Sequence, residues 1–329
     1  MNGRNRADST YRAIACADLG NRYLKWIDAN GTTRCIPSVI KELDDWEDAT
    51  FSDRTLILEV DGRRYAIGEL AKALGGFSVF SESKTDWAWL LGLVALEPNL
   101  GEVSVLIEKM RYAIPDARNR DDLLSIKRLE GTHDFKLNGR DRIATVRSVE
   151  PWDETRAAYR YAVAKGMFRY PGLTNGIITM GGGTTNASLF APDGTQLRGE
   201  DVIAIGTFGL AEKIATALLP SLGHSLEPAL IMDAIERGDY RYGHPSEGTY
   251  FEPQFQKATA AVIQELRQKL KTRWAAKLAA NAIGEVLICG GSAPLLKPLE
   301  EQTKQRFRVP AVAGQPDLTQ FMTLHGMAL

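Results

Sequence analysis

Three glycine-bearing loops, each directly after an apolar run, hold the residues best suited to binding a phosphate group. The first reads Asp18-Leu19-Gly20-Asn21-Arg22-Tyr23-Leu24-Lys25. Gly20 lets the backbone approach an anion, successive N–H groups can bind it, and Lys25 adds a positive charge. Asp18 is suited to holding a Mg²⁺ ion through water, because hard cations prefer oxygen ligands. An ordinary β-hairpin is the alternative interpretation.

The second loop and the third loop come later in the chain. The second reads Gly181-Gly182-Gly183-Thr184-Thr185, and the third places Gly290-Gly291-Ser292 between a strand and a helix. Three successive glycines have a high entropic cost for a simple connection, which favours phosphate contact as much as a structural turn. A backbone edge without side chains suits the flat face of a purine or sugar, although a tight strand–helix turn explains the third loop equally simply.

The elements that must position these loops follow from apolar patterning. Strands are expected at 13–19, 23–27, 33–36, 176–180, 186–190 and 285–289, and Asp61-Gly62 and Asn138-Gly139 predict two further hairpins. Helices are expected at 68–74, 85–96, 153–165, 210–219, 227–236 and 254–282, and another from about 295. The segment 237–251 is expected to be an exposed loop. This mixture predicts an α/β protein.

Composition limits the classes of function. With 329 residues, of which 44% are hydrophobic, two domains are expected. A net charge of −1 carries no signature of direct nucleic-acid binding, and the basic residues between Lys257 and Lys277 suit either a solvated helix face or a partner surface. Three dispersed cysteines, no apolar leader in the first ten residues and no membrane-length apolar run predict a cytoplasmic protein.

The first and second loops lie in segments that resemble each other. Each segment is a strand, a glycine loop, a second strand and a turn that ends in glycine. If Asp18 is aligned with Thr179, Gly20 falls on Gly181. Such an internal repeat predicts two related domains.

Taken together and in this order, the three loops resemble the phosphate 1, phosphate 2 and adenosine motifs of the actin-like ATPase superfamily. Within it the chain is most similar to the bacterial ParM/StbA plasmid-segregation group. The resemblance extends to the segment 60–68, to the Asn138-Gly139 hairpin and to the closing Leu324-His325-Gly326-Met327.

The resemblance implies an actin-like fold of two domains, each ribonuclease-H-like, with a nucleotide cleft between them. Domain I would comprise 1–152 and 315–329, and domain II would comprise 153–314. The family binds ATP or ADP with Mg²⁺, forms head-to-tail filaments of its own chain and segregates plasmid DNA through a DNA-binding adaptor. Carried onto this chain, the site residues are Asp18, Gly20, Asn21, Arg22, Tyr23, Lys25, Gly181, Gly182, Gly183, Thr184, Thr185, Gly290, Gly291 and Ser292.

Two positions depart from the family pattern. The phosphate 2 motif normally begins and ends with aspartate, whereas this chain has Thr179 and Asn186. Because a lost general base or water-positioning group costs about 10²–10⁴ in rate, ATP hydrolysis is expected to be slow while binding survives. Glu150 and Glu154 are the candidates for positioning the attacking water, and Glu154 equally suits a helix N-terminus, where the dipole favours a carboxylate.

Glu212 and Lys213, expected on a helix after the second loop, are candidates for contacting the ribose or base, and a surface charge pair is the alternative. The leading hypothesis is a polymerising ATPase. A nucleotide-gated scaffold with little turnover is the second. A small-molecule kinase of the same fold is the third, although no sugar-binding signature supports it.

Overall fold

The computed structural model describes residues 9–44, 46–47, 55–79, 84–99, 101–114, 120–311 and 318–329. The chain divides into two compact units, the first formed by Met1–Ala157 with Thr323–Leu329 and the second by Ala158–Met322. These limits fall inside two helices, α4 (Glu154–Ala164) and α10 (Leu318–Ala328). The domain limit that the sequence predicts between residues 314 and 315 lies outside the described residues. Residues 1–8, which belong to the segment in which the sequence predicts no apolar leader, also lie outside them.

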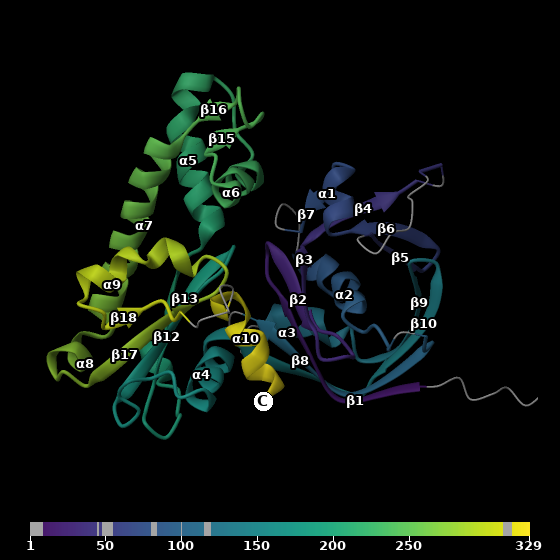
Figure 1. The fold of residues 1–329 in the computed structure, drawn as a ribbon, viewed down its shortest axis with the longest axis horizontal. Helices are drawn as coiled ribbons and strands as arrows, with labels where there is room; N and C mark the ends of the chain where they lie inside the picture. The colour runs from purple at the N-terminus through teal and green to yellow at the C-terminus, as the bar shows by residue number, and fades with distance from the viewer. Residues whose placement is uncertain are drawn as a thin grey trace, which may run out of the picture. The chain divides into compact units, whose positions relative to one another are not determined.

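Unit 1 is built on one large sheet (Figure 1). At its centre, β1 runs parallel to β8, which in turn pairs in parallel with β10 and β11. The strands are β1 (Ser9–Leu19), β2 (Tyr23–Ile27), β3 (Thr33–Pro37), β4 (Val39–Leu43), β5 (Leu56–Val60), β6 (Arg63–Ile67), β7 (Phe77–Ser78), β8 (Ser104–Ile114), β9 (Gly131–Leu137), β10 (Arg140–Val146) and β11 (Val149–Asp153).

The helices of unit 1 complete its core. They are α1 (Glu69–Ala73), α2 (Lys84–Val94), α3 (Arg120–Lys127) and the start of α4. Leu90, Leu91, Leu93 and Val94 of α2 are all buried against the sheet. Burial of such side chains contributes about 1.5–3 kcal/mol each, so α2 is a main anchor of the unit.

Unit 2 has a smaller mixed sheet in the order β14-β13-β12-β17-β18. Its strands are β12 (Thr174–Met180), β13 (Thr184–Phe190), β14 (Val202–Ile205), β17 (Ile283–Cys289) and β18 (Phe307–Arg308). Its helices are α5 (Thr207–Leu222), α6 (Pro228–Arg237), α7 (Glu252–Arg273), α8 (Ala275–Ala279) and α9 (Pro298–Gln302), with short 3₁₀ turns at Arg198–Glu200 and Ala293–Leu296. Figure 1 shows α5, α6 and α7 grouped beside the small β15–β16 hairpin (Arg241–Tyr242 and Thr249–Tyr250).

Local patterning predicted the tight hairpins well. Asp61 and Gly62 have φ values of 52° and 75°, and Asn138 and Gly139 have 51° and 71°. Positive φ at both central residues is the mark of the type I′ turn that these residue pairs favour. The prediction of both hairpins is confirmed.

Two expectations were wrong, and one central strand was missed. The predicted helix 254–282 is two helices, because the chain leaves α7 at Trp274, whose buried ring donates from Nε1 to the Glu200 carbonyl at 2.7 Å. The predicted loop 237–251 contains the β15–β16 hairpin. The central strand β8 was not predicted, because Glu108, Lys109 and Arg111 interrupt its apolar pattern.

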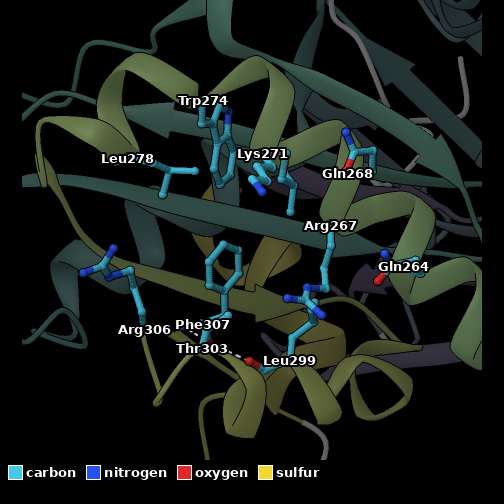
Figure 2. Close-up of a pocket in the computed structure, with 11 residues that line it drawn as sticks. Gln264, Arg267, Gln268, Lys271, Trp274, Leu278, Leu299, Thr303, Arg306 and Phe307 are labelled. Carbon is cyan, nitrogen blue, oxygen red and sulfur yellow. Dashed lines mark hydrogen bonds between the residues drawn. The ribbon is translucent and has the colours of Figure 1, made fainter.

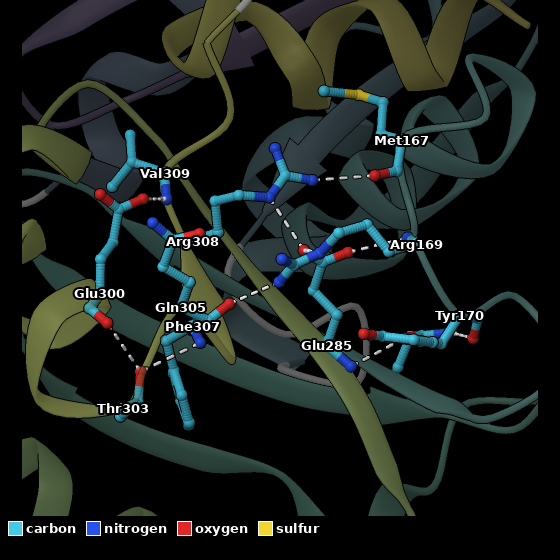
Figure 3. Close-up of polar contacts among 11 residues, drawn as sticks. Met167, Arg169, Tyr170, Glu285, Glu300, Thr303, Gln305, Phe307, Arg308 and Val309 are labelled. Carbon is cyan, nitrogen blue, oxygen red and sulfur yellow. Dashed lines mark hydrogen bonds and ion pairs between the residues drawn. The ribbon is translucent and has the colours of Figure 1, made fainter.

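A buried carboxylate ties the edge of unit 2 together (Figure 3). Glu285 of β17 is fully buried, and its Oε1 lies 2.8 Å from Nε of both Arg169 and Arg308. Its Oε2 accepts the Arg169 N–H at 3.0 Å, and Arg308 also donates to the Met167 carbonyl at 2.9 Å. The carboxylate therefore joins β17, β18 and the segment that precedes β12.

The Glu285 network yields a stability prediction. Glu285→Gln removes the charge and leaves two arginines without their carboxylate. Breaking a buried pair costs about 3–5 kcal/mol, and the partial exposure of both arginines lowers the expected loss of unfolding free energy to about 2–3 kcal/mol. Urea unfolding measures it. The matched control, Glu265→Gln, breaks an exposed pair with Lys269 and is expected to cost below about 0.5 kcal/mol. Equal effects would contradict the role of burial.

Candidate functional site

In unit 1, the first loop is the turn of the β1–β2 hairpin. Asp18 and Lys25 are directly opposite each other on the two strands. Both are buried, and Lys25 Nζ donates to Asp18 Oδ2 at 3.0 Å. Burial alone would lower the pKa of Lys25, but the adjacent Asp18 carboxylate outweighs it, so the pKa is raised above its ordinary value. The lysine therefore stays charged in a buried position.

The turn itself is tight and supported from outside the hairpin. The Gly20 N–H donates to the Tyr23 carbonyl at 3.0 Å, and a Cβ on Gly20 would lie 2.8 Å from that oxygen. Ser38, which is fully buried, donates from Oγ to the Gly20 carbonyl at 2.7 Å and from its N–H to the Arg22 carbonyl at 2.9 Å. Sequence reasoning missed Ser38, and its place directly before β4 was the only signal for it.

In unit 2, the second loop repeats this geometry. Thr179 and Asn186 are directly opposite each other on β12 and β13, with the same spacing as Asp18 and Lys25. The Gly181 N–H donates to the Thr184 carbonyl at 2.9 Å, again three residues ahead. The internal repeat found in the sequence is therefore a repeated hairpin, present once in each unit.

The start of α5 holds the second loop in place. The N–H groups of Gly206, Thr207 and Phe208 donate to the carbonyls of Gly183, Gly181 and Gly182 at 3.0, 3.2 and 2.8 Å. A Cβ on Gly206 would lie 2.6 Å from the Gly181 oxygen, so only glycine fits this approach. Sequence reasoning missed Gly206 and Thr207.

These hydrogen bonds use the carbonyl groups of the second loop and not its N–H groups. Within the described residues, the N–H groups of Gly182 and Gly183 have no hydrogen-bond acceptor. Free N–H groups in a glycine turn suit an anion. The second loop therefore fits a phosphate through its backbone.

The third loop, between β17 and the following 3₁₀ turn, lies beside the second. Gly290 has φ +95°, and a Cβ there would lie 2.4 Å from the Met180 carbonyl oxygen. The same carbonyl accepts the Ser292 N–H at 3.2 Å, and Ser292 Oγ lies 3.4 Å from Thr207 Oγ1. The structure thus brings the second and third predicted loops together within unit 2.

Where the family pattern has two carboxylates, the second hairpin is neutral. Thr179 and Asn186 are both buried. Asn186 Nδ2 donates to Thr184 Oγ1 at 3.2 Å, whereas its buried Oδ1 has no partner among the described residues. An orphaned buried oxygen indicates a place for a water or another donor.

The two candidate glutamates of unit 1 differ in surroundings. Glu150 on β11 lies 2.8 Å from Lys109 Nζ and 3.5 Å from Arg111 Nε, and the hydrogen bond from Lys109 lowers its pKa. Glu154 begins α4, and its negative charge contributes to the raised pKa of Lys25. At Lys25 the charge of Glu154 is a smaller influence than burial and the adjacent Asp18 carboxylate, whereas Glu150 is engaged directly by two cations.

The remaining predicted residues are placed as follows. Arg22 lies 5.7 Å from the centre of the Tyr23 ring, and Glu212 and Lys213 are exposed on α5.

Within the described part of the chain, no cluster of three or more metal-binding side chains occurs. A Mg²⁺ ion held through water and phosphate oxygens needs few protein ligands, and the buried carboxylate of Asp18 is an oxygen donor of the kind that such an ion prefers. None of the described helices has the length and apolar character needed to cross a membrane.

The buried Asp18–Lys25 pair predicts a loss of stability at high pH. A raised lysine pKa contributes stability that is complete below the unfolded value, about 10.4, and is lost as the pH rises through the folded pKa. The difference in unfolding free energy between wild type and Asp18→Asn/Lys25→Met is expected to shrink from pH 9 to pH 12, measured by urea unfolding. The exposed-pair variant Glu265→Gln/Lys269→Met is the control and is expected to show a small difference throughout. A constant difference for the buried pair would contradict the prediction.

The two adjacent glycines of the third loop are expected to differ in how much stability their replacement by alanine costs. Gly290→Ala forces an L-residue into the left-handed region and against the Met180 carbonyl, with an expected cost of about 1–3 kcal/mol. Gly291→Ala meets nothing closer than 3.9 Å and is expected to change stability by less than about 0.5 kcal/mol. Thermal unfolding of both variants measures the contrast. Equal stability of the two would show that the loop has another conformation.

Comparisons with known proteins agree with this geometry. Residues 16–94 match the family model for the N-terminal domain of actin like proteins. No curated protein sequence matched the chain.

Solved structures share the fold over nearly the full chain. The ADP complex of Ta0583, an archaeal actin homologue, is 14% identical with a TM-score of 0.73, covering 96% of this chain and 97% of that one. A 15-stranded ParM filament from Clostridium botulinum is 15% identical with a TM-score of 0.73, covering 97% and 100%. The Alp12 filament structure is 15% identical with a TM-score of 0.61, covering 96% and 97%. The chain is thus an actin-like protein in fold, resembling ParM, with an actin-like N-terminal domain at residues 16–94.

Proposed function

We propose that this protein binds ATP or ADP with Mg²⁺ and polymerises head to tail into filaments in a nucleotide-dependent way. The observation that carries the proposal is the repeated hairpin, because each unit holds a glycine turn of the same geometry. Such turns bind phosphate through backbone N–H groups.

Each loop has a role in this proposal. Lys25 binds a phosphate oxygen, Asp18 holds the Mg²⁺ ion through water, and the Gly182 and Gly183 N–H groups bind phosphate from unit 2. The bound ion supplies positive charge that neutralises the phosphates. Gly290, Gly291 and Ser292 present backbone to the adenosine, with Glu212 and Lys213 as further contacts. The remaining residues of the two hairpin loops, Asn21, Arg22, Tyr23, Gly181, Thr184 and Thr185, shape the site.

Hydrolysis is proposed to be slow. The neutral pair Thr179 and Asn186 carries no charge with which to orient an attacking water. Glu150 is paired with Lys109 and Arg111, so its carboxylate is less available as a base. Glu154, coupled to Lys25, is the better candidate for positioning the water.

The relatives support assembly and nucleotide binding. The archaeal homologue was solved with ADP, and the ParM and Alp12 structures are filaments. By analogy, we propose that this chain self-associates in the cytoplasm and segregates plasmid DNA through a DNA-binding adaptor.

A nucleotide-gated scaffold is a second candidate function. The neutral, buried Thr179–Asn186 pair favours it, because nucleotide binding survives without these carboxylates while turnover does not. In this case ATP binding alone controls filament stability.

Sedimentation with ATP, ADP and GTP, with phosphate release followed in the same samples, tests assembly. Pelleting that depends on ATP is expected, with slow phosphate release. A protein that stays monomeric with every nucleotide at high concentration would refute polymerisation.

Thr179→Asp separates the ATPase from the scaffold. The variant restores a carboxylate at the position where the family has one, and phosphate release is expected to rise at least about tenfold. Thr179→Asn, which has a similar shape and no charge, is the control and is expected to show no gain. Fast release by the wild type would reject the scaffold.

A further inference from the structure

A groove of about 360 Å³ lies on unit 2 between the end of α7 with α8 on one side and α9 with β18 on the other (Figure 2). Figure 2 shows the rings of Trp274 and Phe307 facing each other among the residues that line it. Both rings are buried, with centroids 6.3 Å apart and planes at 20°, and the half-buried Leu278 extends the apolar floor. This volume is at the lower end of the range for ligand pockets, about 300–1,000 Å³, and suits one large side chain.

The rim of the groove is cationic. Arg267 and Lys271 of α7 are exposed on it, and Arg306 borders it before β18. Arg267 donates to the Gln302 amide oxygen at 2.8 Å and Arg306 to that of Asn281 at 2.9 Å, so both bind neutral partners. No acidic residue is among the described residues that line the groove. Three cations around an aromatic floor suit an aromatic side chain flanked by carboxylates.

The chain carries such a side chain in unit 1. Trp46 is 78% exposed, the most exposed large apolar side chain of the described residues. It stands within the acidic sequence Asp44-Asp45-Trp46-Glu47-Asp48. Tryptophan is enriched among the interface residues that contribute most of the binding energy, and burying an exposed indole removes a large apolar surface from water.

Two acidic residues close to Trp46, Asp44 and Glu47, are joined by hydrogen bonds. The Glu47 N–H donates to the Asp44 carbonyl at 3.0 Å, and Glu47 Oε2 accepts the Asp44 N–H at 3.0 Å. Glu47 Oε1 lies 2.5 Å from Lys41 Nζ. A preorganised turn lowers the entropic cost of docking its tip.

From these two surfaces we propose that the Trp46 turn of one copy docks in the α7–α9 groove of a second copy. The indole fills the groove above Trp274 and Phe307, and the carboxylates of Asp44 and Glu47 face the cations on its rim, which are Lys271, Arg267 and Arg306. This inference rests on the proposed self-assembly and names the residues that carry it.

The proposed contact joins two different surfaces of the same chain. Such a heterologous contact leaves a free turn on one copy and a free groove on the other. It therefore propagates into an open filament unless a ring closes. Charge complementarity makes it sensitive to salt, because exposed pairs are screened.

Trp46→Ala tests the turn, with wild type and nucleotide as in the sedimentation assay. The critical concentration for pelleting is expected to rise about tenfold or more, since truncating a central interface tryptophan is among the costliest changes. Leu124→Ala removes another exposed apolar side chain of unit 1 and is the matched control, with no change expected. Unchanged nucleotide affinity of both variants shows that the fold is retained.

Lys271→Glu tests the groove. The same charge reversal at Arg273, which is on the same helix but outside this groove, is its control. Lys271→Glu is expected to raise the critical concentration about tenfold, and combining it with Asp44→Lys is expected to restore part of the loss. Equal effects of Lys271→Glu and Arg273→Glu would overturn the proposal.

Mixing the two assembly-deficient variants gives the sharpest result. The Trp46→Ala chain keeps an intact groove, and the Lys271→Glu chain keeps an intact turn, so together they form one productive contact. A one-to-one dimer without filaments is expected by analytical ultracentrifugation. A mixture that stays monomeric would overturn the proposal.

The outcomes separate this inference from the proposed function. If wild type fails to assemble, polymerisation itself fails. If wild type assembles and Trp46→Ala assembles equally well, only the docking proposal fails.

Discussion

A single hydrogen bond organises the candidate site in each unit. The N–H of the first loop glycine donates to the carbonyl three residues ahead, at 3.0 Å for Gly20 and 2.9 Å for Gly181. This bond closes the hairpin tightly. The anion binding proposed for the loops depends on this turn, because a tight glycine turn can present backbone N–H groups to an anion.

The two copies of the turn are stabilised by different means. In unit 1, the strand ends directly behind the glycine loop carry opposite charges, and Ser38, between β3 and β4, supports the loop. In unit 2, the strand ends are neutral, and the first residues of α5 support the loop through three backbone hydrogen bonds. The charged hairpin is suited to cation and phosphate chemistry, and the neutral hairpin to binding alone. This asymmetry is the physical basis of the proposal that the protein binds nucleotide but hydrolyses it slowly.

Unit 2 has a buried ion-pair network and, near it, the groove between α7 and α9. Glu285, with two arginines, ties β17 to β18 and to the segment before β12. The nearby groove between α7 and α9 has its aromatic floor packed, yet its cations bind only neutral amides among the described residues. A groove with unpaired positive charge and a well-packed surround is suited to docking. Because its residues are already held in place, binding costs little further conformational entropy.

The sequence by itself determined the fold class, the glycine loops and the tight turns, because these depend on local rules. Asp61-Gly62 and Asn138-Gly139 favour a type I′ turn when they stand between two strands. The internal repeat that aligns Asp18 with Thr179 is visible in the sequence without any knowledge of packing. Only the tertiary structure decided that β8 is the central strand of unit 1, since its charged residues find partners on other elements. It likewise revealed Ser38 and Gly206, whose importance lies in contacts with loops distant in the chain. Such contacts leave no periodic trace in the sequence, and so only the folded chain shows them.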